Sequence, residues 1–137
     1  MTSRVVGVDI NAAYIESARS RFLGQFRTLE LYSGDMQTTE VRFDPVDMFC
    51  AAPVFEYLDL SAALMRIASL VARGGILGTV LQLSSVAMPA VTPSPFQSLE
   101  RLAPVMRLVP PEQLRAAAEP CVELSSGKCF QIQVFRT

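Results

Sequence analysis

Hydrophobic positions near the start of the chain change from a continuous run to a helical spacing. Residues 5–8 (VVGV) form a short, mostly β-branched run that ends at Asp9, which is typical of a buried parallel strand. Asn11 belongs to the residue types that cap helices. Apolar side chains then recur at helical spacing, at Ile15, Ala18 and Phe22. We therefore predict a strand followed by an amphipathic helix over residues 12–22.

The alternation of apolar runs and helical stripes continues along the chain. Runs at 29–32, 46–51 and 76–83 predict three more strands. Between the last two, Asp59 can cap a helix and Gly74-Gly75 can stop it in a left-handed conformation. The apolar face of this helix is formed by Leu60, Leu64, Ile67 and Val71. Because crossovers of this length connect parallel strands, we predict an α/β fold.

Residues 84–109 interrupt the regular pattern. Four of the nine prolines fall here, at Pro89, Pro93, Pro95 and Pro104. A short helix-like stretch at 96–102 lies among them, and we interpret the segment as an excursion that is either a lid or a plain surface loop. After it, Pro110-Pro111 predicts a helix that ends at Pro120. Its inward side chains would be Leu114, Ala117 and Ala118.

The tail has the two-residue period of a strand. Phe130, Ile132 and Val134 alternate with glutamines, and Ser126-Gly127 separates this run from residues 122–124. We therefore predict a closing antiparallel hairpin over residues 120–137. In that hairpin Leu124 would face Cys129, which leaves Cys121 and Cys129 out of disulfide register.

Composition narrows the function classes. The chain has 12 Lys plus Arg against 13 Asp plus Glu, so no charge excess predicts a nucleic-acid or membrane partner. It has no histidine, and its three cysteines lack metal-ligand spacing, which excludes a zinc set and a histidine-activated nucleophile. An odd number of thiols without a signal sequence favours the cytoplasm. The length of 137 residues predicts one domain, residues 1–137.

Two acids follow neighbouring predicted strands. Asp9 ends the first strand, and Asp35 closes the Ser33-Gly34-Asp35 turn after the second. Open α/β sheets bind ligands at the carboxyl ends of their strands, where a carboxylate can accept the hydroxyls of a ribose. Alternatively, Asp9 caps the following helix and Asp35 belongs to an ordinary turn. The pair predicts a shared adenosine crevice.

The order of the motifs resembles a known family. The series VVGVDINAAYIESAR, YSGDM, FDPVDMFCAAPVFEYLD and ARGGILGTVLQ is similar to class I S-adenosylmethionine-dependent methyltransferases from their second strand onward, over roughly residues 4–83. The predicted hairpin matches the family's usual ending. The resemblance implies a Rossmann-like, mostly parallel sheet with helices on both faces and S-adenosylmethionine as cofactor.

The resemblance also implies roles for individual residues. Asp9 would bind the ribose hydroxyls, Ile10 would pack on the adenine, and Asp35 with Met36 would contact the adenine edge. The methyl-transfer site would be lined from the segment after residues 46–51. Its cofactor contacts would be Cys50 and Ala51, and its acceptor contacts Pro53, Phe55 and Tyr57, with Phe96 from the excursion.

Other interpretations of these site residues compete with the family roles. Phe55 and Tyr57, taken separately, are slightly more typical of core packing than of an acceptor site. Cys50 is more typical of a small buried hydrophobic residue than of a nucleophile. If a base is needed, Glu56, Tyr57 or an acid from the excursion could serve, but no spacing singles out a catalytic residue.

One family feature has no counterpart in the sequence. Family members carry a first strand and a glycine-rich loop that approaches the methionine half of the cofactor, and Gly7 lies inside a strand candidate instead. In the family's sheet order that strand lies between the strands represented by residues 5–8 and 46–51. We therefore expect an N-terminally truncated domain that is completed by upstream sequence, by a homo-oligomer or exchanged segment, or by direct pairing of the two edges.

Three functions are compatible with these residues and patterns. The leading one is methyl transfer to a small-molecule acceptor, through alignment of nucleophile, methyl group and sulfur. A second is a non-catalytic or partner-dependent protein that keeps the fold. A third is a nicotinamide-dependent oxidoreductase, in which an acid after the second strand also binds ribose, although the reversed tail argues against it.

Overall fold

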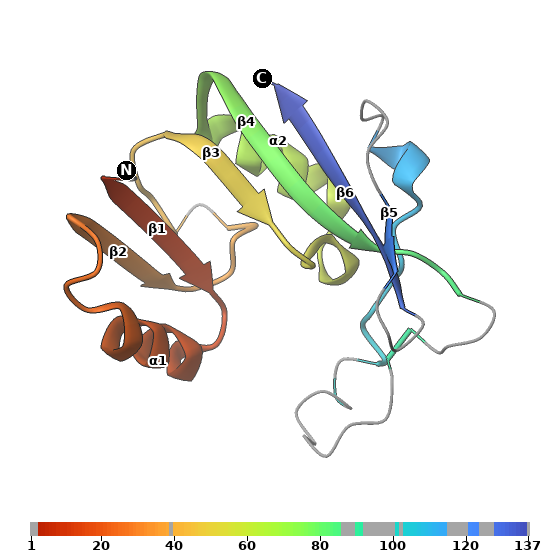
Figure 1. The fold of residues 1–137 in the computed structure, drawn as a ribbon, viewed down its shortest axis with the longest axis horizontal. Coiled ribbons are helices and arrows are strands. Elements are labelled where there is room, and N and C mark those ends of the chain that lie inside the picture. Colours follow the sequence, from red (N-terminus) through yellow and green to blue (C-terminus); the bar gives the residue numbers. More distant parts are fainter. Residues whose placement is uncertain are drawn as a thin grey trace. The chain divides into compact units, whose positions relative to one another are not determined.

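The computed structural model describes residues 3–38, 40–85, 90–91, 101, 103–114, 121–123 and 128–136. The chain forms two compact units, Met1–Asp44 and Pro45–Thr137. Figure 1 shows the elements of both units. The single-domain assignment stays a prediction.

The first unit is a strand–helix–strand crossover (Figure 1). Strands β1 (Arg4–Asp9) and β2 (Thr28–Ser33) pair in parallel, and helix α1 (Ala12–Phe22) connects them. The Asn11 side chain caps α1 by accepting the backbone N–H of Ala13 at 2.9 Å. The predicted helix bounds are confirmed, and both strands extend one residue beyond the predicted runs at each end.

The second unit contains a four-stranded sheet with the order β3-β4-β6-β5. The pairing of β3 with β4 is parallel, while β6 is antiparallel to both β4 and β5. Helix α2 lies along one face of this sheet (Figure 1). The elements are β3 (Val46–Ala51), the 3-10 helix η1 (Phe55–Tyr57), α2 (Leu60–Leu70), β4 (Val71–Gln82), the 3-10 helix η2 (Pro111–Gln113), β5 (Cys121–Glu123) and β6 (Cys129–Arg136).

The core of the second unit lies between α2 and the sheet. Each large apolar side chain that it buries contributes about 1.5–3 kcal/mol of transfer free energy. The helix buries Ala63, Ile67 and Leu70, and β4 buries Leu77 and Leu81. Of the stripe predicted after Asp59, Ile67 is buried on the helix, whereas Leu60 and Leu64 are only half-buried. The Asp59 side chain caps α2 by accepting the backbone N–H of Ala62.

The predicted glycine stop of α2 is wrong. The helix ends at Leu70, and β4 begins at once with Val71, which is buried and pairs with Val46. Gly74 does have a positive φ of 80°, but it lies inside β4, where the register against β3 shifts between Val46 and Met48. Burial of Val71 in the sheet ends the helix before it reaches the two glycines. The glycines lie instead at an irregularity of β4, where its pairing with β3 shifts.

Two further predictions change in the second half. Of the helix expected between Pro110 and Pro120, the described residues 110–114 contain the short 3-10 helix η2, followed by the buried Leu114. Ala117, Ala118 and most of the stretch 96–102 lie outside the described residues.

In the hairpin, Cys129 pairs with Glu123 instead of Leu124, because the ladder is shifted by one residue. Cys121 pairs with Gln131, so the two cysteines are out of disulfide register, as predicted.

Strands β1 and β3 are each the last strand of their sheet. Among the described residues β1 pairs only with β2, and β3 only with β4. These are the two strands for which the family resemblance predicts a further strand partner. Completion of these edges by other sequence or by a homo-oligomer stays a prediction. In the described part of the chain, no helix is long and apolar enough to span a bilayer.

Candidate cofactor and acceptor site

The two predicted ribose and adenine acids lie at the same end of the first unit. Asp9 is the last residue of β1 and pairs in parallel register with Ser33, two residues before Asp35. The Gly34 N–H donates to the Asp9 carbonyl oxygen at 3.0 Å, which joins the two strand ends. The sequence therefore correctly predicted that both acids follow neighbouring parallel strands at one edge.

The Asp9 carboxyl has one oxygen engaged and one available. Its Oδ1 accepts the backbone N–H of Asn11 at 2.7 Å, whereas no described residue bonds to its Oδ2. The alternative in which Asp9 caps α1 is wrong, because the Asn11 side chain is the cap. The next residue, Ile10, is 76% exposed, so it presents an apolar side chain to solvent directly after β1.

Asp35 builds the turn that follows β2. Its Oδ1 accepts the Gln37 N–H at 2.8 Å, and its carbonyl oxygen accepts both the N–H and the hydroxyl of Thr38. The ordinary-turn interpretation is therefore correct as a description of its local bonds. Met36 is half-buried within the same turn. The contact of both residues with adenine stays a prediction.

The segment after β3 has an uneven exposure. Ala51 is buried, and its carbonyl oxygen accepts the Thr79 hydroxyl of β4 at 2.8 Å. Cys50 is exposed, so the expectation that it is a buried hydrophobic residue is wrong. Successive side chains of a strand point to opposite faces, and Cys50 points to the exposed face of β3, whereas Ala51 points to the buried one. Pro53 is exposed as well, and Phe96 lies outside the described residues.

The two aromatic residues of η1 differ from each other. Phe55 is only 1% exposed, which agrees with core packing, whereas Tyr57 is half-buried. Burial raises the pKa of the Tyr57 hydroxyl, and the neighbouring Glu56 carboxylate raises it further. At neutral pH Tyr57 is therefore a hydrogen-bond donor and a poor base.

Glu56 is a buried carboxyl that connects η1 to the end of β4. The residue is only 1% exposed, and its Oε1 accepts the Gln82 N–H at 2.8 Å. Its backbone oxygen accepts the Arg107 N–H at 2.7 Å, which ties the end of the 84–109 excursion to η1. No described residue bonds to Oε2. The sequence analysis considered Glu56 only as a possible base. It could not predict the structural role of this residue, because both hydrogen-bond partners, Gln82 and Arg107, lie far away along the chain.

We expect Glu56→Ala to destabilise the chain and Glu56→Gln to leave stability close to the wild type. Alanine removes the acceptor of the buried Gln82 N–H, which costs about 1–3 kcal/mol. Glutamine keeps an oxygen for that N–H and removes a carboxylate oxygen without a described partner. Urea denaturation of the three proteins measures the difference. Equal midpoints for the alanine and glutamine variants would contradict this role.

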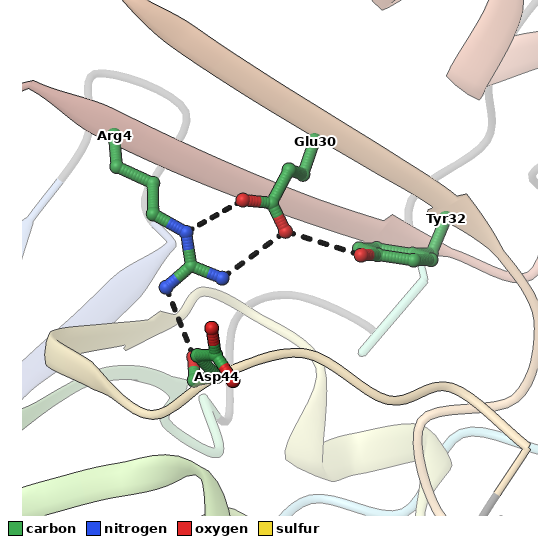
Figure 2. Close-up of polar contacts among 4 residues, drawn as sticks. All are labelled: Arg4, Glu30, Tyr32 and Asp44. Atoms are coloured by element: carbon green, nitrogen blue, oxygen red, sulfur yellow. Dashed lines mark hydrogen bonds and ion pairs between the residues drawn. The ribbon is translucent and has the colours of Figure 1, made fainter.

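A polar cluster holds the first unit together on the face shown in Figure 2. The Arg4 guanidinium donates to both carboxylate oxygens of Glu30, at 2.6 and 3.1 Å, and to the Asp44 carbonyl oxygen at 3.0 Å. The Tyr32 hydroxyl donates to Glu30 at 3.1 Å, and its ring stacks on Phe43. The Arg4 hydrogen bond holds the pKa of Glu30 below its usual range, and bonding to Glu30 raises the pKa of Tyr32.

The contribution of this cluster to stability should depend on pH. Because the pKa of Glu30 is lower in the folded than in the unfolded chain, the ion pair stabilises at neutral pH and is lost as the pH falls through the folded value. We expect Glu30→Gln to lower the melting temperature at pH 7, and the gap from the wild type to close toward pH 3. The control Glu16→Gln, on the exposed face of α1, should show little difference at either pH. A gap for Glu30→Gln that is independent of pH would exclude the ionised pair as its cause.

Comparison with protein families provides the decisive observation. Residues 1–75 match the family described as a methyltransferase domain, which is more than half of the 137 residues. The chain belongs to the methyltransferase-domain family. The family match contains β1, α1, β2, β3 and α2, and therefore every predicted adenosine contact. A comparison with curated protein sequences gave no match.

Solved structures show the same fold. The N-methyltransferase NodS from Bradyrhizobium japonicum WM9 is 18% identical, with a TM-score of 0.64, over 98% of this chain and 73% of that one. Its complex with S-adenosyl-L-homocysteine gives 15% identity and a TM-score of 0.69, over 98% and 66% of the two chains. The magnesium protoporphyrin IX methyltransferase ChlM from Synechocystis PCC 6803, with bound S-adenosylhomocysteine, gives 13% and 0.68, over 96% and 63%.

These similarities show the methyltransferase-like, Rossmann-like fold and not the reaction. The chain spans about two thirds of the length of NodS in its complex and of ChlM. The [4+2]-cyclase SpnF is also similar, with 13% identity and a TM-score of 0.68 over 98% of this chain and 66% of that one. One fold therefore hosts different chemistries, and function has to be argued from the site.

The residues at the carboxyl edge of β1 and β2 fit the adenosine part of S-adenosylmethionine. A carboxylate oxygen without a described partner, on Asp9, is an acceptor for ribose hydroxyls. The next residue, Ile10, is an exposed apolar side chain of the kind that can pack on a base. Asp35 follows the adjacent strand at the same edge. The donors and acceptors of this methyltransferase-domain chain therefore suit the cofactor that its family implies.

Proposed function

We propose that this chain transfers a methyl group from S-adenosylmethionine to a small-molecule acceptor. The single observation that carries the proposal is the pair Asp9 and Asp35 at one edge of β1 and β2, with an Asp9 oxygen available to a ligand. The family match supports the same cofactor. The cofactor, when bound, supplies an electrophilic methyl group.

The protein's part in this proposal is binding and orientation. Asp9 accepts the ribose hydroxyls, Ile10 packs on the adenine, and Asp35 with Met36 contacts the adenine edge. Cys50 and Ala51 lie on the cofactor side of the acceptor. These residues would bind the adenosine half of the cofactor. The rate acceleration would come from alignment of the acceptor nucleophile with the methyl group of the cofactor.

The acceptor side is formed from η1 and its neighbours in this proposal. Pro53 and Tyr57 are accessible to an acceptor, and Phe55 supports them from the core. The Tyr57 hydroxyl keeps its proton at neutral pH, since its pKa is raised, so it orients an acceptor atom by donating a hydrogen bond. The balance of charge supports an acceptor smaller than a nucleic acid. A cytoplasmic location and a homo-oligomer remain predictions that accompany the proposal.

Thermal unfolding with S-adenosylhomocysteine and with NAD, side by side, tests the proposed cofactor. A ligand at about 100 times its dissociation constant adds about 2.7 kcal/mol to stability. We expect S-adenosylhomocysteine to raise the melting temperature and NAD to leave it unchanged. Stabilisation by NAD alone would favour the oxidoreductase alternative. Stabilisation by neither ligand would favour the non-binding alternative.

A further inference from the structure

A small cavity lies at the carboxyl end of β4. Its volume is about 260 Å³. Its lining includes Gln82, Leu83, Ser84, Ser85, Leu108 and Lys128. Because β3 and β4 are parallel, this is also the end of the sheet at which β3 leads into η1. Ligands of open α/β sheets bind at such carboxyl ends.

The polar groups of this cavity are held in place by one carbonyl oxygen. The Ala90 oxygen accepts the Gln82 side-chain amide at 2.7 Å and the Lys128 ammonium at 3.3 Å. An ammonium has three donors, and this bond uses one of them. Among the described residues that line the cavity, Lys128 carries a positive charge and none carries a carboxylate. A partly buried cation favours an anionic ligand.

The cavity is bonded to the proposed acceptor segment. Gln82, which lines it, donates its backbone N–H to Glu56, and Glu56 lies between Phe55 and Tyr57 in η1. The Arg107 N–H bonds to the Glu56 carbonyl oxygen, and the next residue, Leu108, lines the cavity. The cavity wall and the acceptor segment therefore form one hydrogen-bonded assembly within the second unit.

We propose that this cavity binds a carboxylate group of the methyl acceptor, with Lys128 as its counter-ion. The proposal rests on the proposed methyl transfer. Ser84 and Ser85 line the same space, and the Ser84 hydroxyl adds a donor. Leu83 and Leu108 offer apolar surface to the carbon skeleton. A volume of about 260 Å³ is below the usual range for a whole ligand, so the cavity takes the acidic end of the acceptor and not all of it.

Benzoate and the neutral benzamide are matched probes of this site. We expect ligand-observed NMR titrations to show benzoate binding at millimolar concentrations and benzamide binding at least about tenfold more weakly. Lys128→Met keeps the length of the side chain and removes its charge, so it should weaken benzoate at least about tenfold. Lys128→Arg, which keeps the charge, should retain binding. Arg73→Gln removes a cation from the opposite end of β4 and should change nothing.

Three results would overturn the carboxylate site. They are equal binding of benzoate and benzamide, unchanged benzoate binding by Lys128→Met, and absence of benzoate binding to the wild type at millimolar concentrations. S-adenosylhomocysteine binding is titrated separately and should be the same in the wild type and Lys128→Met. Absence of benzoate binding to a wild type that binds S-adenosylhomocysteine thus counts against the carboxylate site alone, whereas absence of S-adenosylhomocysteine binding counts against the proposed function.

Discussion

Replacing Asp9 by asparagine should lower the affinity of the chain for S-adenosylhomocysteine about ten- to hundredfold. A charge-assisted hydrogen bond contributes about 1.5–3 kcal/mol, and each 1.4 kcal/mol is about a factor of ten in affinity. Asparagine keeps the Oδ1 acceptor that the Asn11 N–H uses at 2.7 Å, but it loses the charge that the ribose hydroxyls would meet. Isothermal titration calorimetry measures the affinity of both proteins.

The Asp9→Asn experiment separates binding from folding. Because the amide oxygen can still accept the Asn11 N–H, the melting temperature without ligand should stay close to that of the wild type. Glu16→Gln is the matched control, since it removes one acid from α1 in the same unit and away from the strand ends. Equal affinities of Asp9→Asn and the wild type would remove Asp9 from the cofactor site. Equal losses in both variants would indicate an effect of net charge.

Replacing Gly75 by alanine should lower the free energy of unfolding by about 3 kcal/mol or more. A Cβ at this position would lie 2.8 Å from the Ala72 carbonyl oxygen and 2.9 Å from the Asp47 carbonyl oxygen. It would also lie 2.7 Å from Cγ1 of Val71. The Asp47 oxygen belongs to β3, so that clash is relieved only if β3 and β4 separate. The Ala72 oxygen belongs to β4 itself, so its clash is relieved only if the backbone of β4 rearranges locally.

Gly74→Ala is the comparison that tests the close approach at Gly75. Gly74 has a φ of 80°, and an L-residue in this region costs about 1–2 kcal/mol, but nothing lies within 4 Å of a Cβ there. Urea denaturation should therefore rank the wild type above Gly74→Ala, and Gly74→Ala above Gly75→Ala. A larger loss for Gly74→Ala would show that backbone strain and not the close approach to β3 limits this segment.

The first half of the fold was largely readable from local patterns. Helix α1 begins and ends where the spacing of Ile15, Ala18 and Phe22 predicts, and β3 has the predicted bounds. The end of α2 was not readable, because Val71 continues the helical stripe in sequence. Its pairing with the distant Val46 in the sheet decides the outcome. Likewise, the sequence could not predict that Cys129 pairs with Glu123, because this pairing depends on the register of β5 against β6.

The candidate site divides in the same way. Asp9 and Asp35 were predicted because each follows its own strand, and parallel pairing then brings both to one edge. The cavity at Lys128 had no signal in the sequence. Lys128 meets the Ala90 carbonyl oxygen across 38 positions, and only the antiparallel pairing of β6 with β4 brings the two segments together.

The order of the motifs carries the resemblance to the methyltransferase family. The sequence by itself also determined the order of the strands and α-helices from β1 to β4 and the two acids at the strand ends. The strands, the helices and the acids can be predicted because they depend on the periodicity of side chains and on residues that are close in sequence, so no distant contact has to be known. Only the tertiary structure decided the burial of Glu56, the register around Gly75 and the cavity beside Lys128. Each of these features depends on hydrogen bonds or close contacts between segments that are far apart in the chain. Such contacts form only when the folded chain packs these segments together.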